Sequence, residues 1–142
     1  MQKLVKQLNA LPDANTGKPV DAAQIILCQK QLCENDFAPL PEKYAALLHH
    51  FNAFAWNGSF LYGVKPFKDF FLDLVGENML AFHPLPNLNV ILGCNEYDYL
   101  AWNCADASYQ IIDKSDFMVL NTYAGCADAV RHILKIEDDE YL

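Results

Sequence analysis

The sequence predicts an α+β fold, with an antiparallel sheet of about four to six strands flanked by N-terminal helices and a C-terminal helix. Two observations lead to this class. Apolar residues recur at helical spacing in the first third of the chain and again near its C-terminus, and short strand-like segments separated by polar turns lie between them. Strands joined by short turns pair antiparallel, so the helices should pack against the sheet and not alternate with its strands.

Three helices are expected in the N-terminal third. Apolar residues three or four apart form one face of residues 1–11, and the proline that follows ends this helix. Asp21 is a typical N-cap, and the helix after it is expected to end near residues 35–36. Pro41 suits a first helical turn. It predicts a third helix that ends at Asn52, because asparagine accepts the left-handed conformation.

The spacing of apolar residues changes from helical to strand-like near Asn57-Gly58. This dipeptide is typical of a hairpin turn. The segments with strand character are residues 59–64, 88–94, 99–103, 109–113 and 117–121. Helical spacing returns over residues 67–75 and again over residues 126–136, which should form the closing helix. Residues 137–142 are an acidic tail that we expect to be frayed.

Length and composition indicate a single-domain intracellular protein. The 142 residues fit one domain, residues 1–142, because two smaller pieces would struggle to bury a core each. Residues 1–10 mix polar with apolar residues, unlike a signal peptide, and no apolar run approaches the roughly 20 residues that a membrane span needs. The five cysteines are odd in number and irregularly spaced, so we expect free thiols and a cytoplasmic location.

The placement of charge narrows the choice of partners. The net charge is −8, and the segment from Asp69 to Asp116 holds eight acidic residues against one basic residue, Lys114. Nucleic-acid binding needs clustered Lys and Arg that displace phosphate counterions, so a nucleic-acid ligand is not expected. Two interpretations of the acidic segment remain open, a solvated surface and electrostatic complementarity to a basic protein.

Motifs for catalysis or metal binding are not found. Residues 13–17 resemble the start of a calcium loop, but Gln24 stands where the bidentate glutamate belongs. The four histidines, which do not have the spacing of metal ligands, are His49, His50, His83 and His132. Neither a nucleophile elbow nor a phosphate-binding glycine loop occurs. We therefore expect a non-enzymatic protein without a metal or other cofactor.

Five residues are candidates for contact with a protein partner. They are Trp56, Glu96, Tyr97, Asp98 and Asp106. Trp56 lies in a polar loop and either covers the edge of the sheet or anchors a partner, since tryptophan is enriched in hot spots. Residues 96–98 form an acidic turn around an aromatic, which suits a basic surface, although solvated turns have the same pattern. Glu96 and Asp98 could meet Asp106 or Asp113 in the fold and form a pair of carboxylates like that of a hydrolase. The preference of these residues for turns explains them more simply.

One stretch of the chain has a recognisable pattern, with Leu-Pro-Glu-Lys-Tyr at 40–44, Asn-Gly at 57–58 and Leu-Tyr-Gly at 61–63. It resembles the signature of the SUKH superfamily, in which a Leu-Pro-x-x-Tyr start leads a helix into an Asn-Gly turn and then a strand. The residue pattern is most similar to that of the YrhA-like branch. The resemblance extends over about residues 20–136. It departs from the family at Ala53, where members often have glycine after asparagine.

The resemblance implies an α+β domain with an antiparallel sheet framed by helices. Bacterial members of the family are commonly immunity proteins that neutralise toxins of polymorphic or contact-dependent systems, often nucleases. The resemblance therefore implies a protein-binding domain with a basic toxin domain as its partner, to which an acidic surface would be complementary. The alternatives are another protein-binding or scaffolding role in the same fold, and an enzyme or small-ligand-binding protein.

Overall fold

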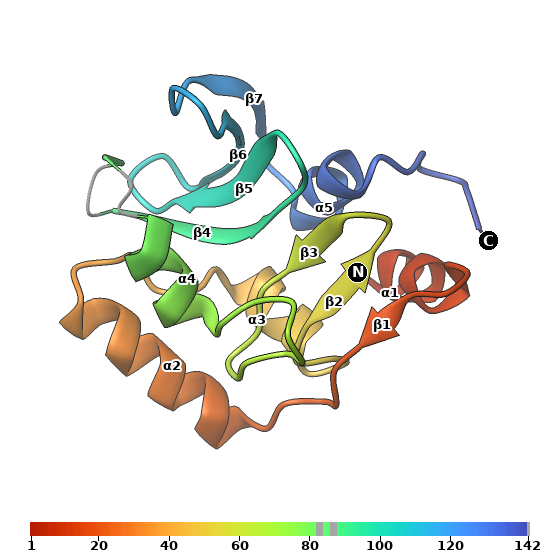
Figure 1. Ribbon diagram of the computed structural model, residues 1–142, viewed down its shortest axis with the longest axis horizontal. Helices are drawn as coiled ribbons and strands as arrows, with labels where there is room; N and C mark the ends of the chain where they lie inside the picture. Colours follow the sequence, from red (N-terminus) through yellow and green to blue (C-terminus); the bar gives the residue numbers. More distant parts are fainter. Residues whose placement is uncertain (82–83, 86–87, 142) are drawn as a thin grey trace.

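The computed structural model describes residues 1–81, 84–85 and 88–141. In this part of the chain it contains five helices and one seven-stranded sheet (Figure 1). The helices are α1 (Gln2–Ala10), α2 (Ala22–Glu34), α3 (Glu42–Leu48), α4 (Leu74–Ala81) and α5 (Cys126–Leu134). The strands are β1 (Asn15–Thr16), β2 (Phe54–Trp56), β3 (Ser59–Leu61), β4 (Asn89–Cys94), β5 (Asp98–Asn103), β6 (Ser108–Asp113) and β7 (Val119–Tyr123). The predicted α+β class is confirmed, and the sheet has more strands than the four to six expected.

The sheet runs in chain order from β1 to β7, and every neighbouring pair is antiparallel. β2 and β3 meet at Asn57 and Gly58, which both have positive φ (53° and 80°), as the hairpin signal predicts. The meander from β4 to β7 follows the predicted strand segments, with β7 displaced by two residues towards the C-terminus. The additional strands are β1 and β2, of two and three residues, which are too short to show a periodic pattern.

Capping and loop contacts set the ends of the N-terminal helices. The Asp21 carboxylate accepts a hydrogen bond from the Gln24 N–H at 2.8 Å, and the Gln24 side chain accepts one from the Asp21 N–H at 3.1 Å. This capping box begins α2 as predicted. α3 ends at Leu48 and not at Asn52. Asn52 is buried, and its N–H instead donates to the Lys18 carbonyl oxygen at 2.7 Å.

The expected helix over residues 67–75 is wrong. The first part of this segment is an irregular loop, and its phenylalanine rings pack on one another and on Phe60 of β3, at 5.7 to 5.9 Å between centroids. A helix begins only at Leu74, where the Asp73 carboxylate accepts a hydrogen bond from the Gly76 N–H at 2.8 Å. Aromatic residues at helical spacing form a ring cluster here because tertiary contacts outweigh local helix propensity.

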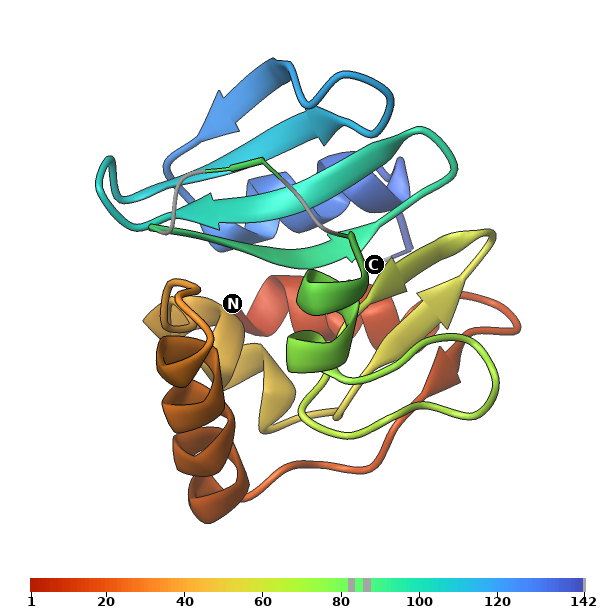
Figure 2. The same ribbon diagram turned by 60° about the vertical axis from the view of Figure 1, so that its left-hand side comes forward.

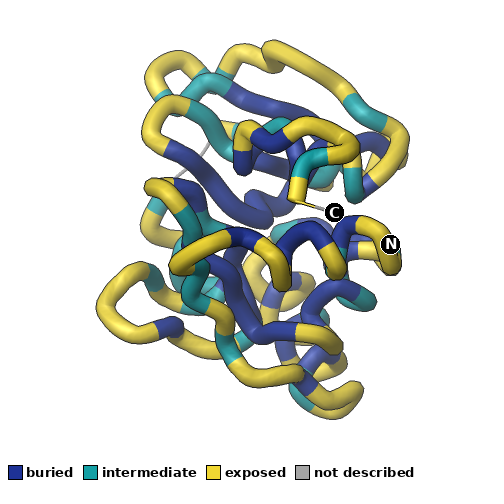
Figure 3. Tube along the Cα trace, turned by 90° about the vertical axis from the view of Figure 1, so that its right-hand side faces the viewer, coloured by how far each residue is buried: buried dark blue, intermediate teal, exposed yellow. Residues whose placement is uncertain are grey.

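Helices lie on both sides of the strands (Figures 1 and 2). α5 packs against β5, β6 and β7, α4 packs against β4, and α2 packs against α4. β4, the middle strand in the order of the sheet, is buried along its whole length, as its apolar sequence predicts. Buried segments, dark blue in Figure 3, run through the interior of the molecule, and exposed loops surround them.

Buried residues of the stretch that carries the family resemblance meet in one cluster, whereas its Asn57-Gly58 turn is exposed. Tyr44 on α3 is fully buried, and its hydroxyl lies 2.5 Å from the Tyr62 carbonyl oxygen and 2.9 Å from that of Leu92 on β4. A Cβ atom at Gly63 would collide with the Asn52 carbonyl oxygen, so the close approach of these two loops requires glycine. These contacts hold α3 and the loop after it to the sheet.

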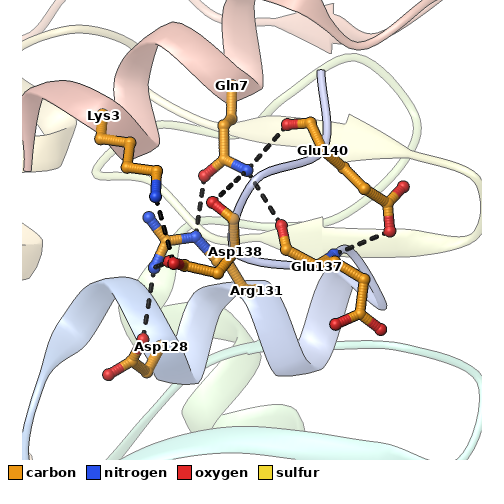
Figure 4. Close-up of polar contacts among 7 residues, drawn as sticks. All are labelled: Lys3, Gln7, Asp128, Arg131, Glu137, Asp138 and Glu140. Atoms are coloured by element: carbon orange, nitrogen blue, oxygen red, sulfur yellow. Dashed lines mark hydrogen bonds and ion pairs between the residues drawn. The ribbon is translucent and has the colours of Figure 1, made fainter. Parts of the chain in front are cut away.

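The C-terminal tail is tied to α1 (Figure 4). The Gln7 amide nitrogen lies within 2.8 to 3.2 Å of three carbonyl oxygens of the tail, and the Gln7 oxygen accepts from Arg131 Nε at 2.8 Å. Asp138 forms ion pairs with Lys3 at 3.1 Å and with Arg131 at 3.2 Å. Lys3, with a smaller effect of Arg131, holds the pKa of Asp138 below its usual value. In place of the frayed tail expected over residues 137–142, the described part of the tail is anchored to a buried glutamine.

Candidate partner-binding surface

The turn between β4 and β5 is built around Asn95, which is buried. Its side-chain oxygen accepts hydrogen bonds from the N–H groups of Tyr97 at 3.0 Å and Asp98 at 2.9 Å. Its amide nitrogen donates to the Ile133 carbonyl oxygen of α5 at 3.1 Å. The Asn95 hydrogen bonds therefore fix the conformation of the turn that carries residues 96–98.

A second acidic turn lies beside the first. The Lys114 N–H donates to the Tyr97 carbonyl oxygen at 2.9 Å, which joins the β6–β7 turn to the β4–β5 turn. Asp98 and Asp113 are direct cross-strand partners on β5 and β6. The Ser115 hydroxyl and N–H donate to the Asp113 carboxylate and lower its pKa, so this group is ionised at neutral pH. Like charges at opposed positions destabilise a sheet, so this placement does not serve folding.

We define the acidic turn surface as Glu96, Tyr97, Asp98, Asp113 and Asp116. In the described part of the chain, none of its four carboxylates forms an ion pair. The neighbouring Lys114 instead lies over the Tyr99 ring, with its Nζ 5.3 Å from the ring centroid. Tyr97 is 64% exposed, and Met118 beside the second turn is 61% exposed. Unneutralised carboxylates next to exposed aromatic and thioether groups suit contact with a basic protein.

Trp56, at the end of β2, is half-buried. Its indole N–H donates to the Pro12 carbonyl oxygen at 2.9 Å, and its ring meets the Tyr141 ring edge-on at 6.0 Å between centroids. Trp56, Glu96 and Lys135 also line a common hollow of about 170 Å³. The structure thus places Trp56 at the border of the acidic turn surface, but its contacts within the chain fit a packing role better than that of an exposed anchor.

Asp106 lies apart from the other candidates. It belongs to the β5–β6 turn, where its N–H donates to Asn103 Oδ1 at 3.1 Å. That turn is at the opposite end of β5 from Asp98, and five steps of about 3.3 Å put about 17 Å between the two ends of the strand. A carboxylate pair for catalysis needs a separation below about 10 Å. Asp106 therefore cannot pair with Glu96 or Asp98, and we leave it out of the acidic turn surface.

All five cysteines are free thiols. Three of them, Cys28, Cys94 and Cys126, are buried, whereas Cys33 and Cys104 are exposed. Burial raises the pKa of Cys28 to about 12 and that of Cys126 to about 11. Both thiols stay protonated at neutral pH, so they act as small core residues and not as nucleophiles.

The side chains that could bind a metal ion are dispersed over the described part of the chain. Across residues 1–81, 84–85 and 88–141, no group of three or more His, Cys, Asp or Glu side chains is placed to hold a metal ion. His49 Nδ1 lies 2.9 Å from the Val20 carbonyl oxygen, and His132 Nδ1 lies 2.6 Å from the Tyr123 hydroxyl. His83 lies outside the described residues.

Among the described residues, no helix has the length and apolar character to cross a membrane. No protein-family model matches the chain, and no curated protein matches it significantly. The resemblance to the SUKH superfamily therefore rests on the residues quoted above.

Proposed function

We propose that this chain is a non-enzymatic protein-binding domain whose acidic turn surface receives a basic face of another protein. The observation that carries the proposal is a set of four carboxylates on two hydrogen-bonded turns, none of which has an ion-pair partner among the described residues. Two of them, Asp98 and Asp113, face each other across the strands at a cost to stability. A basic partner would neutralise this charge.

Electrostatic complementarity would act mainly on the rate of association. A clustered field of one sign raises association rates by about 10- to 1,000-fold, and the effect falls as salt shortens the Debye length from about 8 Å at 0.15 M to about 3 Å at 1 M. The exposed side chains of Tyr97 and Met118 would supply apolar contact that slows dissociation. The carboxylates would thus speed association, and the Tyr97 and Met118 side chains would slow dissociation.

For the partner itself, we propose a basic toxin domain, so that the chain would serve as an immunity protein in a bacterial cytoplasm. The common role of SUKH proteins supports this identity, and the free thiols suit a reducing compartment. The runner-up is a protein-binding or scaffolding role without a toxin, which the same surface would serve. Neither nucleic acid nor membrane is part of the proposal.

The test compares two double variants with the same change in net charge. Glu96→Lys with Asp98→Lys reverses the acidic turn surface, and Asp106→Lys with Asp139→Lys reverses two exposed carboxylates outside it. Each pair adds four charges, from −8 to −4. The tagged wild type and both variants are purified from the native host with their associated proteins. We expect a stoichiometric basic protein with the wild type and the control, lost from the surface variant and released by high salt.

Two results would overturn parts of this proposal. Equal retention by the surface variant, or no retained protein even at low salt, would remove the acidic turn surface as a binding site. The toxin identity has its own test, in which the partner is expressed alone and together with the chain. Growth arrest by the partner that wild type relieves and the surface variant does not would support neutralisation. A harmless partner would refute the toxin identity and leave the scaffolding role.

A further inference from the structure

A second hollow, of about 310 Å³, lies on the β1 side of the sheet and beside the start of α2. Its lining includes Lys18, Val20, Gln24, Lys65, Pro66 and Phe67. The volume is at the lower end of the range of about 300 to 1,000 Å³ for ligand pockets. The acidic turn surface lies on the turns that connect β4 to β5 and β6 to β7. The hollow, on the β1 side, is therefore at a different part of the sheet.

One buried residue, Asn52, holds the two lysine-bearing segments of the hollow together. Its N–H donates to the Lys18 carbonyl oxygen at 2.7 Å. Its side chain brackets the backbone of Lys65, with Nδ2 donating to the carbonyl oxygen and Oδ1 accepting from the N–H, both at 3.1 Å. The backbone positions from which the two lysines extend are therefore fixed before any ligand arrives, which reduces the entropy lost on binding.

Most of the hydrogen-bonding capacity that remains in the side chains of Lys18, Lys65 and Gln24 is that of donors. Lys18 and Lys65 form no ion pair with any residue that the structure describes. Gln24 Oε1 accepts a hydrogen bond from the Asp21 N–H at 3.1 Å, and the amide hydrogens of Gln24 remain available as donors. The Asp21 carboxylate caps α2 by accepting from the Gln24 N–H, and it does not line the hollow. The Asn52 amide is engaged on both sides.

The charge of the lining is opposite to that of the chain. Acidic residues outnumber Lys and Arg by 18 to 10 in the sequence, yet two lysines and, among the residues that the structure describes, no acidic residue line this hollow. The two lysines that line the hollow carry like charges, and an anion bound between them would offset both. An apolar wall that includes Val20 and Phe67 adjoins them, which an inorganic anion would leave uncovered.

We propose that this hollow binds a carboxylate that carries a short apolar body. Lys18, Lys65 and the Gln24 amide would face the carboxylate, and Val20 and Phe67 would cover the body. A small organic acid and the C-terminal carboxylate of a peptide share this chemistry. The site is independent of the acidic turn surface, so either proposal can fail without the other.

Hexanoate is the first probe, with hexanamide as its neutral counterpart, and both are titrated into the ¹⁵N-labelled full chain and followed by amide NMR. We expect hexanoate to bind with a dissociation constant on the order of 1 mM and to shift the amide signals of residues 16–18 and 65. Hexanamide should bind at least about tenfold more weakly, because it lacks the charge that the ammonium groups recognise. Acetyl-Gly-Gly-Leu with a free or an amidated C-terminus distinguishes a peptide source from a small acid.

Two double variants provide the matched comparison. Lys18→Gln with Lys65→Gln should weaken hexanoate binding at least about tenfold, whereas Lys6→Gln with Lys43→Gln, at exposed positions outside the hollow, should leave it unchanged. Wild-type affinity in the first variant, or equal affinity for hexanamide, would overturn the charge recognition. Inorganic phosphate that binds as tightly as hexanoate would overturn the role of the apolar wall. No shift at these amides with either hexanoate or the free-acid peptide would overturn the site.

Discussion

Replacement of Tyr44 by phenylalanine should lower the free energy of unfolding by about 2 kcal/mol. The side chain is fully buried, and the substitution keeps the ring while it removes the hydroxyl. The Leu92 carbonyl oxygen keeps another donor, the Tyr62 N–H at 2.8 Å, so the Tyr62 carbonyl oxygen is the group left unsatisfied. An unsatisfied buried group costs about 1 to 3 kcal/mol, against a total stability of about 5 to 15 kcal/mol for a domain.

Urea unfolding followed by tryptophan fluorescence measures this change. With a slope of about 2 kcal/mol per molar urea, the midpoint should fall by about 1 M and the slope should not change. Tyr97→Phe is the matched control, because that side chain is 64% exposed, and it should stay within about 0.5 kcal/mol of the wild type. If Tyr44→Phe also stays within that margin, the hydroxyl does not satisfy the Tyr62 carbonyl oxygen and our account of how α3 is held to the sheet is wrong.

Two further predictions concern the tail and the buried thiols. Gln7→Leu removes the hydrogen bonds to the tail, so the amides of residues 137–141 should exchange with deuterium at least about tenfold faster, unlike in the exposed control Gln31→Leu. Unchanged exchange in Gln7→Leu would contradict the anchoring. Alkaline pH should destabilise the fold, because Cys28 and Cys126 keep their protons up to pKa values of about 12 and about 11, whereas the unfolded chain releases them near pH 9. The stabilisation is complete below about pH 9 and is lost as the pH rises through the folded values. Urea unfolding on either side of pH 9 measures it, and equal midpoints would refute the argument.

The buried residues of the SUKH-like stretch serve the fold, whereas its exposed Asn57-Gly58 turn lines the hollow that also includes Glu96. Tyr44, Asn52 and Gly63 lie in a buried cluster that joins α3 to the sheet. The acidic turn surface lies on exposed turns far along the chain from residues 40–63. Under the proposed function, substitutions on the two turns should change the partner without disturbing the buried cluster.

The sequence by itself determined the fold class, the starts of the N-terminal helices and most of the meander. The capping pair of Asp21 and Gln24 and the Asn57-Gly58 turn act within a few residues, so their effect is visible in the chain itself. The continuous apolar run of β4 likewise predicts a strand that is covered on both faces. The acidic turn at residues 96–98 was predictable for the same reason, since a turn between two strands is exposed.

The tertiary structure decided what these elements bring together. The phenylalanines of residues 67–75 have helical spacing, but their rings found partners on β3 and formed a cluster instead. Strand pairing placed Asp113 opposite Asp98 and left Asp106 at the far end of the same strand. Gln7 meets a tail about 130 residues away, and Asn52 joins two lysine segments into one hollow. The partners in such contacts lie far apart in the chain, so a short window of sequence does not contain both of them. Their energies are of the same order as local propensities and can therefore override them.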